Sequence, residues 1–231
     1  MSRIFITGDK HGSIELKRLS NKNWPLAHEL NKNDIVIICG DAGFMWYNSN
    51  ETKYWDDWAE ERSFTILTAW GNHENYTAIR SLPLEKWNGG LVRKVRPHVM
   101  YAENGEIFTL NNQTFFFMGG ATSVDKIYRV EGKSWWAEEI PSNKEMEHAA
   151  ENLEKYDMRV NHIITHTAPN FILDKFYYEH DSLTNFLTNY VQKFVSFDHW
   201  WFGHFHNNRN FTYDNINYNY HMLYHDIEEI K

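Results

Sequence analysis

The chain has 231 residues, 42% of them hydrophobic and 16% aromatic, and this composition excludes an intrinsically disordered protein. A formal net charge of −8 counts against a general nucleic-acid-binding surface, and the single cysteine, Cys39, excludes an intrachain disulfide. No window approaches the roughly 18 apolar residues of a membrane span, and the N-terminus becomes polar too early for a signal peptide. We therefore expect one domain over residues 1–231, in a reducing, cytoplasmic compartment.

The first third of the chain alternates apolar runs with helical patterns. Runs rich in β-branched residues predict buried strands at residues 3–8, 34–41 and 64–72. Between these strands, the spacing of apolar residues predicts helices at 13–20 and 51–62. Strands that alternate with helices in this way form a parallel sheet with helical crossovers.

The middle of the chain has a different pattern. Residues 91–121 are rich in β-forming residues and contain the turn signals Pro97, ENG and NN, which predict a meander of antiparallel strands. Ser142, with Glu145 three residues later, forms a capping box at the start of a helix predicted at 142–157. The remaining predicted elements are a helix at 181–194 and strands at 160–169 and 199–206. In residues 210–225, aromatic residues alternate with polar ones, which predicts an antiparallel hairpin.

Polar side chains follow five of these strands. They are Asp9, His11, Asp41, Asn72, His73, His166, His204 and His206. The first motif alone is also explained by a strand-to-helix turn in which Asp9 or Ser13 caps the next helix. Ligands of α/β proteins bind beyond the carboxyl ends of strands, however, so all five motifs together predict one shared site. Oxygen and imidazole donors without a thiolate favour Mn, Fe or Zn, and the number of donors suits two metal ions.

The order of these motifs, D-x-H, GD, GNH followed by Glu or Asp, H and GHxH, closely resembles the calcineurin-like metallophosphoesterase superfamily over about residues 4–206. Residues 119–142 also resemble a bacterial and phage-type branch whose substrates are undefined. The second motif departs from the frequent GDxxD form, because GDAGFMW lacks the later Asp. The resemblance implies an α/β fold, a four-layer αββα sandwich of two mixed β-sheets flanked by helices.

The resemblance also implies a role for each motif residue. One divalent metal ion would be held by Asp9, His11 and His206, and a second by Asn72, His166 and His204. Asp41 would bridge the two ions. His73 would be catalytic and not a ligand, binding phosphate oxygens or protonating the leaving group.

The function implied is hydrolysis of phosphate mono- or diesters by a metal-bridging hydroxide, with Mn expected and Fe or Zn as alternatives. The expected substrate is small or nucleotide-like. No membrane partner and no stable nucleic-acid complex are expected, and the oligomeric state is left open. Two alternatives remain at this point: a non-catalytic binding scaffold of the same fold, and a nuclease acting on nucleic-acid ends. The complete set of motif residues, including His73, favours an enzyme over a scaffold.

Several residues outside the motifs have two interpretations. Arg129 and Lys126 either clamp a substrate phosphate or belong to a solvated helix face, and Asp125 either orients Arg129 or caps the turn. The pairs Trp135–Trp136 and Trp46–Tyr47 are expected to pack, with stacking on a planar group as the alternative. Glu74 is expected to start a helix or to support the ligands from behind.

Overall fold

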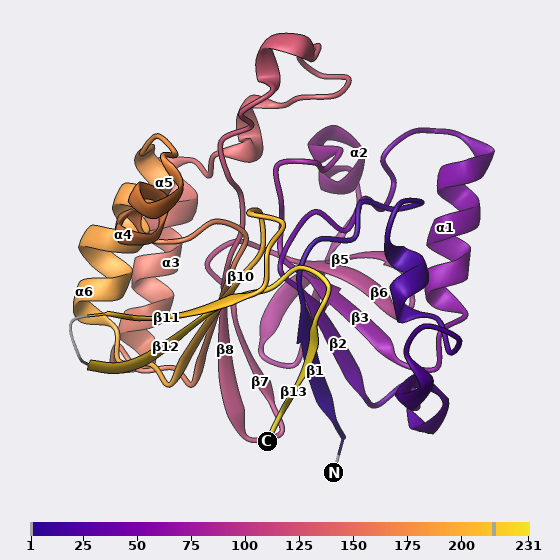
Figure 1. The fold of residues 1–231 in the computed structure, drawn as a ribbon, viewed down its shortest axis with the longest axis horizontal. Coiled ribbons are helices and arrows are strands. Elements are labelled where there is room, and N and C mark those ends of the chain that lie inside the picture. The colour runs from indigo at the N-terminus through magenta and orange to yellow at the C-terminus, as the bar shows by residue number, and fades with distance from the viewer. Residues whose placement is uncertain (1, 214–215) are drawn as a thin grey trace.

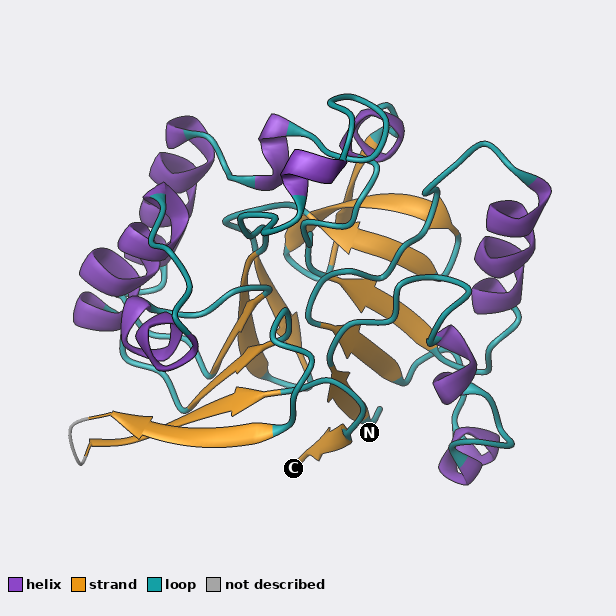
Figure 2. Cartoon of the chain, turned by 45° about the horizontal axis from the view of Figure 1, so that its top comes forward, coloured by secondary structure: helices purple, strands orange, loops and turns teal. Residues whose placement is uncertain are grey.

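The structure is a computed structural model that describes residues 2–213 and 216–231. Two β-sheets pack face to face, and helices cover the outer face of each sheet (Figures 1 and 2). This arrangement confirms the predicted four-layer αββα sandwich. Both termini lie at the same end of the sandwich, away from the loops that follow the parallel strands (Figure 1).

The first sheet has seven strands in the order β13-β1-β2-β3-β6-β5-β4. Their bounds are β1 Ile4–Thr7, β2 Ile35–Ile38, β3 Thr65–Thr68, β4 Leu84–Trp87, β5 Gly90–Arg96, β6 Val99–Ala102 and β13 Ile227–Ile230. Strands β1, β2, β3 and β6 run parallel, while β13, β5 and β4 pair antiparallel at the two sides. The parallel strands therefore deliver their carboxyl ends to one edge.

The second sheet has six strands in the order β11-β12-β10-β9-β8-β7. Their bounds are β7 Ile107–Leu110, β8 Gln113–Met118, β9 His162–Thr165, β10 His199–Phe202, β11 Arg209–Tyr213 and β12 Ile216–Met222. Strands β8, β9, β10 and β12 run parallel, and β7 and β11 are antiparallel edges. The antiparallel hairpin predicted at 210–225 corresponds to β11 and β12, and residues 214–215 lie outside the described part.

Most helices are short. The α-helices are α1 Asn50–Glu60, α2 Tyr76–Arg80, α3 Asn143–Lys155, α4 Asn170–Leu173, α5 Ser182–Phe186 and α6 Gln192–Phe194. Tighter 3₁₀ turns are η1 Leu16–Leu19, η2 Pro25–Glu29, η3 Lys126–Tyr128, η4 Ala137–Glu139 and η5 Asp174–Phe176, and η6 Leu187–Val191 is a π turn between α5 and α6. Within the described residues, no helix has the length and apolar character needed to cross a membrane.

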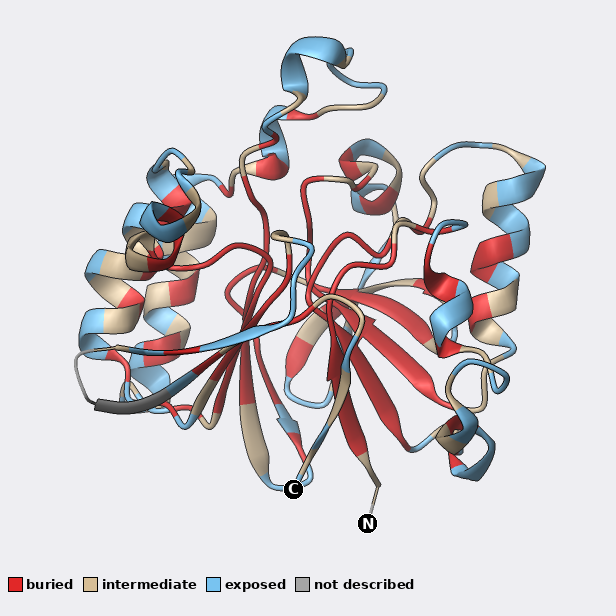
Figure 3. Ribbon diagram, viewed as in Figure 1, coloured by how far each residue is buried: buried red, intermediate tan, exposed pale blue. Residues whose placement is uncertain are grey.

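Three hydrophobic clusters correspond to the three interfaces of the sandwich, and buried residues fill them (Figure 3). One cluster joins α1 and the 3₁₀ turns to the outer face of the first sheet, through residues such as Trp55 and Phe64. A second joins α3, α4 and α5 to the second sheet around Trp200. The third lies between the sheets and contains Cys39 and Phe117, so the cysteine is a buried core residue.

The capping box predicted at the start of the helix at 142–157 is confirmed, and the structure adds a second cap that was not predicted. Ser142 Oγ accepts a hydrogen bond from the Glu145 backbone N–H at 3.3 Å, and Glu145 Oε2 accepts from the Ser142 backbone N–H at 2.8 Å. Helix α1 begins after Ser49, whose hydroxyl accepts from the Thr52 backbone N–H at 3.1 Å. These contacts lie within three residues, which is why the sequence pattern reveals them.

Three predictions of secondary structure were wrong or incomplete. Residues 13–20 form only the turn η1, because the preceding loop has positive φ at His11 and Gly12 and hydrogen-bonds to residues 41–42. Residues 91–121 do not form one meander: β5 and β6 join the first sheet, and the hairpin β7–β8 joins the second. The strands β4 and β13 were not predicted.

Candidate metal centre

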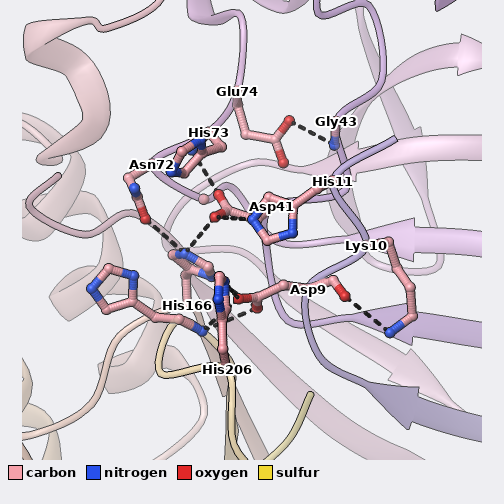
Figure 4. Close-up of polar contacts among 12 residues, drawn as sticks. Asp9, Lys10, His11, Asp41, Gly43, Asn72, His73, Glu74, His166 and His206 are labelled. Atoms are coloured by element: carbon pink, nitrogen blue, oxygen red, sulfur yellow. Dashed lines mark hydrogen bonds and ion pairs between the residues drawn. The ribbon is translucent and has the colours of Figure 1, made fainter. Parts of the chain in front are cut away.

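The loops that follow β1, β2, β3, β9 and β10 converge at one edge of the sandwich (Figure 4). They bring together the polar residues that the sequence placed after these strands. Asp41 lies in the middle of the group. Its Oδ2 is 3.2 Å from His11 Nε2 and 3.4 Å from His166 Nε2, and its Oδ1 accepts a hydrogen bond from the His73 backbone N–H at 2.7 Å.

Asp9 occupies the neighbouring position. Its Oδ2 is 3.1 Å from His206 Nε2, and its Oδ1 is 3.8 Å from His166 Nδ1. The backbone N–H of His204 donates to the Asp9 carboxylate at 3.0 Å. Asn72 Oδ1 lies 2.9 Å from His166 Nε2. Asp9 near the start of the chain and His206 near its end thus share one polar cluster.

Three groups of side chains in this cluster have ligand atoms close enough to share a metal ion, within 4.8 Å of one another. They are Asp9, His11 and His206; Asp9, Asp41 and His166; and His11, Asp41 and His73. Each aspartate belongs to two of the three groups. Carboxylate and imidazole donors without a thiolate suit Mn, Fe or Zn, so the residues fit divalent metal ions.

One predicted ligand and one predicted non-ligand differ from this grouping of acidic and imidazole side chains. His204 is in none of the three groups, although its ring centroid is 5.0 Å from that of His166. The amide oxygen of Asn72 contacts His166. His73, which was expected not to bind metal, shares a group with His11 and Asp41. The ring of His73 is therefore close enough to approach either a metal ion or a bound substrate.

The backbone is strained at several of these residues. His11, Asp41, His204 and His206 have φ values of 43°, 52°, 68° and 49°. Non-glycine residues rarely adopt this left-handed region, and such strain concentrates at functional sites. The surrounding hydrogen bonds stabilise the strained loops so that the side chains point toward one another.

Glycines beside the motif residues permit this close packing. A Cβ atom on Gly71 would lie 2.0 Å from Asp41 Oδ1, and one on Gly203 would lie 2.1 Å from Asp9 Oδ1. At Gly40, which has a φ of 86°, it would lie 2.4 Å from His166 Nδ1. Gly40, Gly71 and Gly203, which precede Asp41, Asn72 and His204, therefore each make room for another predicted ligand.

The charges of the cluster favour cation binding. Burial raises the pKa of Asp41, but His166 and the hydrogen bond from His11 outweigh this effect and hold the pKa well below its usual range. The pKa of Asp9 is also lowered, because contacts with His206 and His166 outweigh burial. Burial lowers the pKa of His11 and His166, but the charge of Asp41 outweighs this effect and raises the pKa of both to about 9. The carboxylates thus remain ionised and attract positive charge.

Arg129 reaches into the site from the loop that projects beyond the sandwich (Figure 1). Its side chain is only 8% exposed, Nη2 is 2.8 Å from His73 Nδ1, and Asp125 Oδ2 accepts from Nε at 2.9 Å. The solvated-face interpretation is therefore wrong for Arg129, and Asp125 does orient it. Lys126 is exposed, and among the described residues its side chain has no hydrogen bond or ion pair.

The comparison with protein families agrees with this geometry. The family model for calcineurin-like phosphoesterases matches residues 2–208, which is most of the chain. The chain belongs to the calcineurin-like phosphoesterase family. The family implies divalent metal ions and hydrolysis of phosphate esters. A search among curated proteins found no match to this sequence.

Two solved structures resemble this phosphoesterase. One is phosphopantetheinyl hydrolase from Mycobacterium tuberculosis, with a TM-score of 0.51, 12% identity, and coverage of 96% of this chain and 89% of that one. The other is a putative 5'-nucleotidase from Staphylococcus aureus, with a TM-score of 0.49 and 12% identity. This chain spans 50% of that nucleotidase. At such identity, the first likeness supports the fold alone.

Two buried residues support the phosphoesterase site from behind. Glu74 accepts hydrogen bonds from the backbone N–H of Ala42 at 2.8 Å and from the Tyr101 hydroxyl at 2.5 Å, and burial raises its pKa to about 8. It therefore stabilises the loop that follows Asp41, which agrees with a supporting role and not with a ligand. Lys10, which the sequence analysis missed, is fully buried.

The Lys10 ammonium group joins two distant segments. It donates to the carbonyl oxygens of Gly8, Asp9 and Tyr224 at 2.9, 3.1 and 2.9 Å. Lys10 therefore holds the loop after β1 against the segment that connects β12 to β13. A lysine between Asp9 and His11 gives no local signal of this role, because the Tyr224 carbonyl is 214 residues away.

Proposed function

We propose that the chain hydrolyses phosphate mono- or diesters at a centre of two divalent metal ions, using water as the nucleophile. One observation carries the proposal. Two ionised aspartates, an asparagine and five histidines converge at the carboxyl edge of both sheets, with the Arg129 guanidinium beside them. The arrangement combines cation ligands with a cationic side chain for an anionic substrate.

We assign the ligands as the sequence motifs indicate. Asp9, His11 and His206 hold one ion, Asn72, His166 and His204 hold the other, and Asp41 contacts both. Divalent ions at such a centre supply Lewis acidity, which activates water and neutralises charge on a phosphoryl group. Mn is our first choice, with Fe or Zn as alternatives.

The remaining groups act on the substrate. Arg129 donates hydrogen bonds to the non-bridging phosphoryl oxygens, with Asp125 holding its guanidinium in place. Burial lowers the pKa of His73, and Arg129 adds to this effect against the opposing charge of Asp41. An anionic phosphoryl group beside His73 favours the protonated imidazole, which delivers its proton to the leaving-group oxygen. Lys126 remains a weaker candidate for phosphate contact, because it is exposed.

The two other candidate functions have less support. A binding scaffold would not need the complete donor set with His73 beside it. A nuclease would need a surface for nucleic acid, and the chain has a net charge of −8. We therefore propose a small, nucleotide-like phosphate ester as substrate and a cytoplasmic enzyme.

A metal-supplemented substrate screen tests this function. The protein is stripped with chelator, reloaded with Mn²⁺, Fe²⁺ or Zn²⁺, and assayed on para-nitrophenyl esters, cyclic nucleotides and dinucleoside polyphosphates. We expect two bound ions per chain by elemental analysis, strongest activity with Mn²⁺ and none in chelator. Activity that survives chelation, or a fully loaded active protein with one ion, would contradict the proposal.

A further inference from the structure

A pocket of about 260 Å³ opens beside the metal centre, on the side of His11 and His73. Its floor is formed where the first two motif loops meet, at Gly12 and Gly43. A Cβ atom on Gly43 would lie 2.5 Å from the Gly12 backbone nitrogen, so these loops are in close contact. The walls are the apolar side chains of Ile14, Trp46, Tyr47 and Trp55.

Trp46 is held in position next to the site. Its ring centroid is 6.2 Å from that of His73 at an interplanar angle of 32°, and Trp136 packs edge-on against it at 5.8 Å. The Trp46 carbonyl accepts a hydrogen bond from Asn75 Nδ2 at 2.9 Å. The Trp136 indole in turn donates to Thr77 at 2.8 Å. The Trp46 ring therefore has a fixed orientation before any ligand binds.

The mouth of the pocket exposes apolar surface. Ile14 is 72% exposed and Tyr47 is 53% exposed, and both line the pocket. Contiguous apolar surface that a protein leaves uncovered often marks a ligand site. The pocket is continuous with the metal centre through His11 and His73, so a ligand here adjoins a bound phosphoryl group.

Two polar side chains of the pocket, Ser49 and Thr52, are engaged within the protein, whereas Ser13 and Glu51, which also line it, are exposed. The Ser49 hydroxyl lies 3.1 Å from the Thr52 hydroxyl and accepts from the Thr52 backbone N–H, because Ser49 is the N-cap of helix α1 and Thr52 lies in its first turn. The Thr52 hydroxyl also accepts from the Tyr47 backbone N–H at 3.4 Å. A flat apolar ring can contact the Trp46 indole here.

We propose that this pocket binds a planar aromatic ring that the substrate carries close to its phosphoryl group, and that Trp46 determines this specificity. The inference rests on the proposed phosphoesterase function for the position of the phosphoryl group. A nucleobase and a simple aryl group share the required chemistry. Base-aromatic stacking contributes enough to binding that its loss is expected to cost about tenfold or more in affinity.

Binding of two phosphonates tests the pocket without hydrolysis. Benzylphosphonate and cyclohexylmethylphosphonate have rings of similar size, but only the first ring is planar, and neither contains an ester bond. We expect Mn²⁺-loaded protein to bind benzylphosphonate at least about tenfold more tightly by calorimetry. Trp46→Ala should remove this preference and Trp46→Phe should retain most of it. Thermal melting checks that each variant is folded.

Trp87→Ala is the matched control, because Trp87 is also a half-buried indole but lies on β4 and packs against Phe108. It should leave the preference unchanged. Equal affinity for the two phosphonates, no binding of either, or a preference that survives Trp46→Ala would overturn the inference. A Trp46-dependent preference in a protein that hydrolyses no ester would support the pocket and contradict the proposed function.

Kinetics then distinguish the two sources of the ring. Adenosine 5'-phosphate and ribose 5-phosphate share the scissile bond and differ in the base. Benzyl phosphate and cyclohexylmethyl phosphate make the corresponding pair for a simple aryl group. In each pair, kcat/KM of the aromatic substrate is divided by kcat/KM of its non-aromatic partner. The pair with the larger ratio shows whether the pocket prefers a nucleobase or a simple aryl group, and Trp46→Ala should bring that ratio toward one. Ratios near one in both pairs for the wild-type protein would overturn the proposed specificity.

Discussion

Strands β9 and β10 carry histidines at both ends, and the two ends of the sandwich use them in opposite ways. At the carboxyl end, His166 and His204 lie among Asp9 and Asp41. At the amino end, His162 and His199 begin the same strands. His199 Nδ1 is 3.0 Å from His221 Nε2, and the ring of Trp201 stacks on His221 with centroids 3.9 Å apart.

The charges of the two ends differ accordingly. At the carboxyl end, Asp41 raises the pKa of His11 and His166 to about 9 in spite of their burial, whereas burial lowers the pKa of His204 to about 3. At the amino end, burial lowers the pKa of His162 and of His221 to about 4. Among the described residues, every group of three potential metal ligands lies at the carboxyl end. Histidines alone therefore do not make a metal centre, and the buried carboxylates distinguish one end from the other.

Removing a carboxylate at each end gives the largest expected difference. Asp41→Ala should reduce metal content and lower kcat by more than about 100-fold. Loss of a residue that only hydrogen-bonds a metal ligand costs up to about 100-fold in activity, and loss of a ligand itself should cost more. Asp198→Ala at the amino end removes an exposed carboxylate that accepts from Asn161 and should leave both unchanged. Elemental analysis and kinetics measure the result. An active Asp41→Ala protein with both ions would show that Asp41 is not a shared ligand.

A histidine can be removed from each end in the same way. His73→Asn should keep both ions and the fold but lose about 10²–10⁴-fold in kcat on an alkyl ester, because the leaving oxygen needs a proton. The loss should be smaller for a nitrophenyl ester, whose leaving group departs as an anion. His199→Asn is the control and should retain activity. Normal turnover of the alkyl ester by His73→Asn would exclude a catalytic role for His73.

The Arg129 guanidinium distinguishes the carboxyl end further. Arg129→Ala should lower kcat/KM by about tenfold or more, since a hydrogen bond to a charged group contributes about 1.5–3 kcal/mol. Metal content should not change. Lys133→Ala, on the same projecting loop and exposed, is the control. Unchanged kinetics in Arg129→Ala across the substrate panel would mean that the guanidinium only supports the loop.

The smallest expected effect concerns the amino end and pH. Because burial lowers the pKa of His221 from 6.5 to about 4, the unfolded chain binds more protons between these values. The free energy of unfolding of the metal-free protein should therefore fall as pH drops through this window. His221→Gln should make this dependence shallower, as denaturant unfolding would show. An equally steep dependence in the variant would contradict a neutral, half-buried His221.

Local sequence signals determined several features of this protein. The apolar runs located β1, β2, β3, β9 and β10, and the polar residues at their ends identified the members of the candidate site. The cap of α3 was also predictable, because Ser142 and Glu145 interact within one turn. In each case the physical cause lies within a few residues of its effect.

Only the tertiary structure decided the features that depend on distant partners. Strand β13 exists because it pairs with β1, and residues 91–121 divide between two sheets because β6 pairs with β3. Arg129 is buried because its partner is His73, 56 residues earlier. A sequence specifies which residues can bind a metal or a phosphate. Which of them become neighbours depends on packing between elements, and those contacts leave no periodic pattern along the chain.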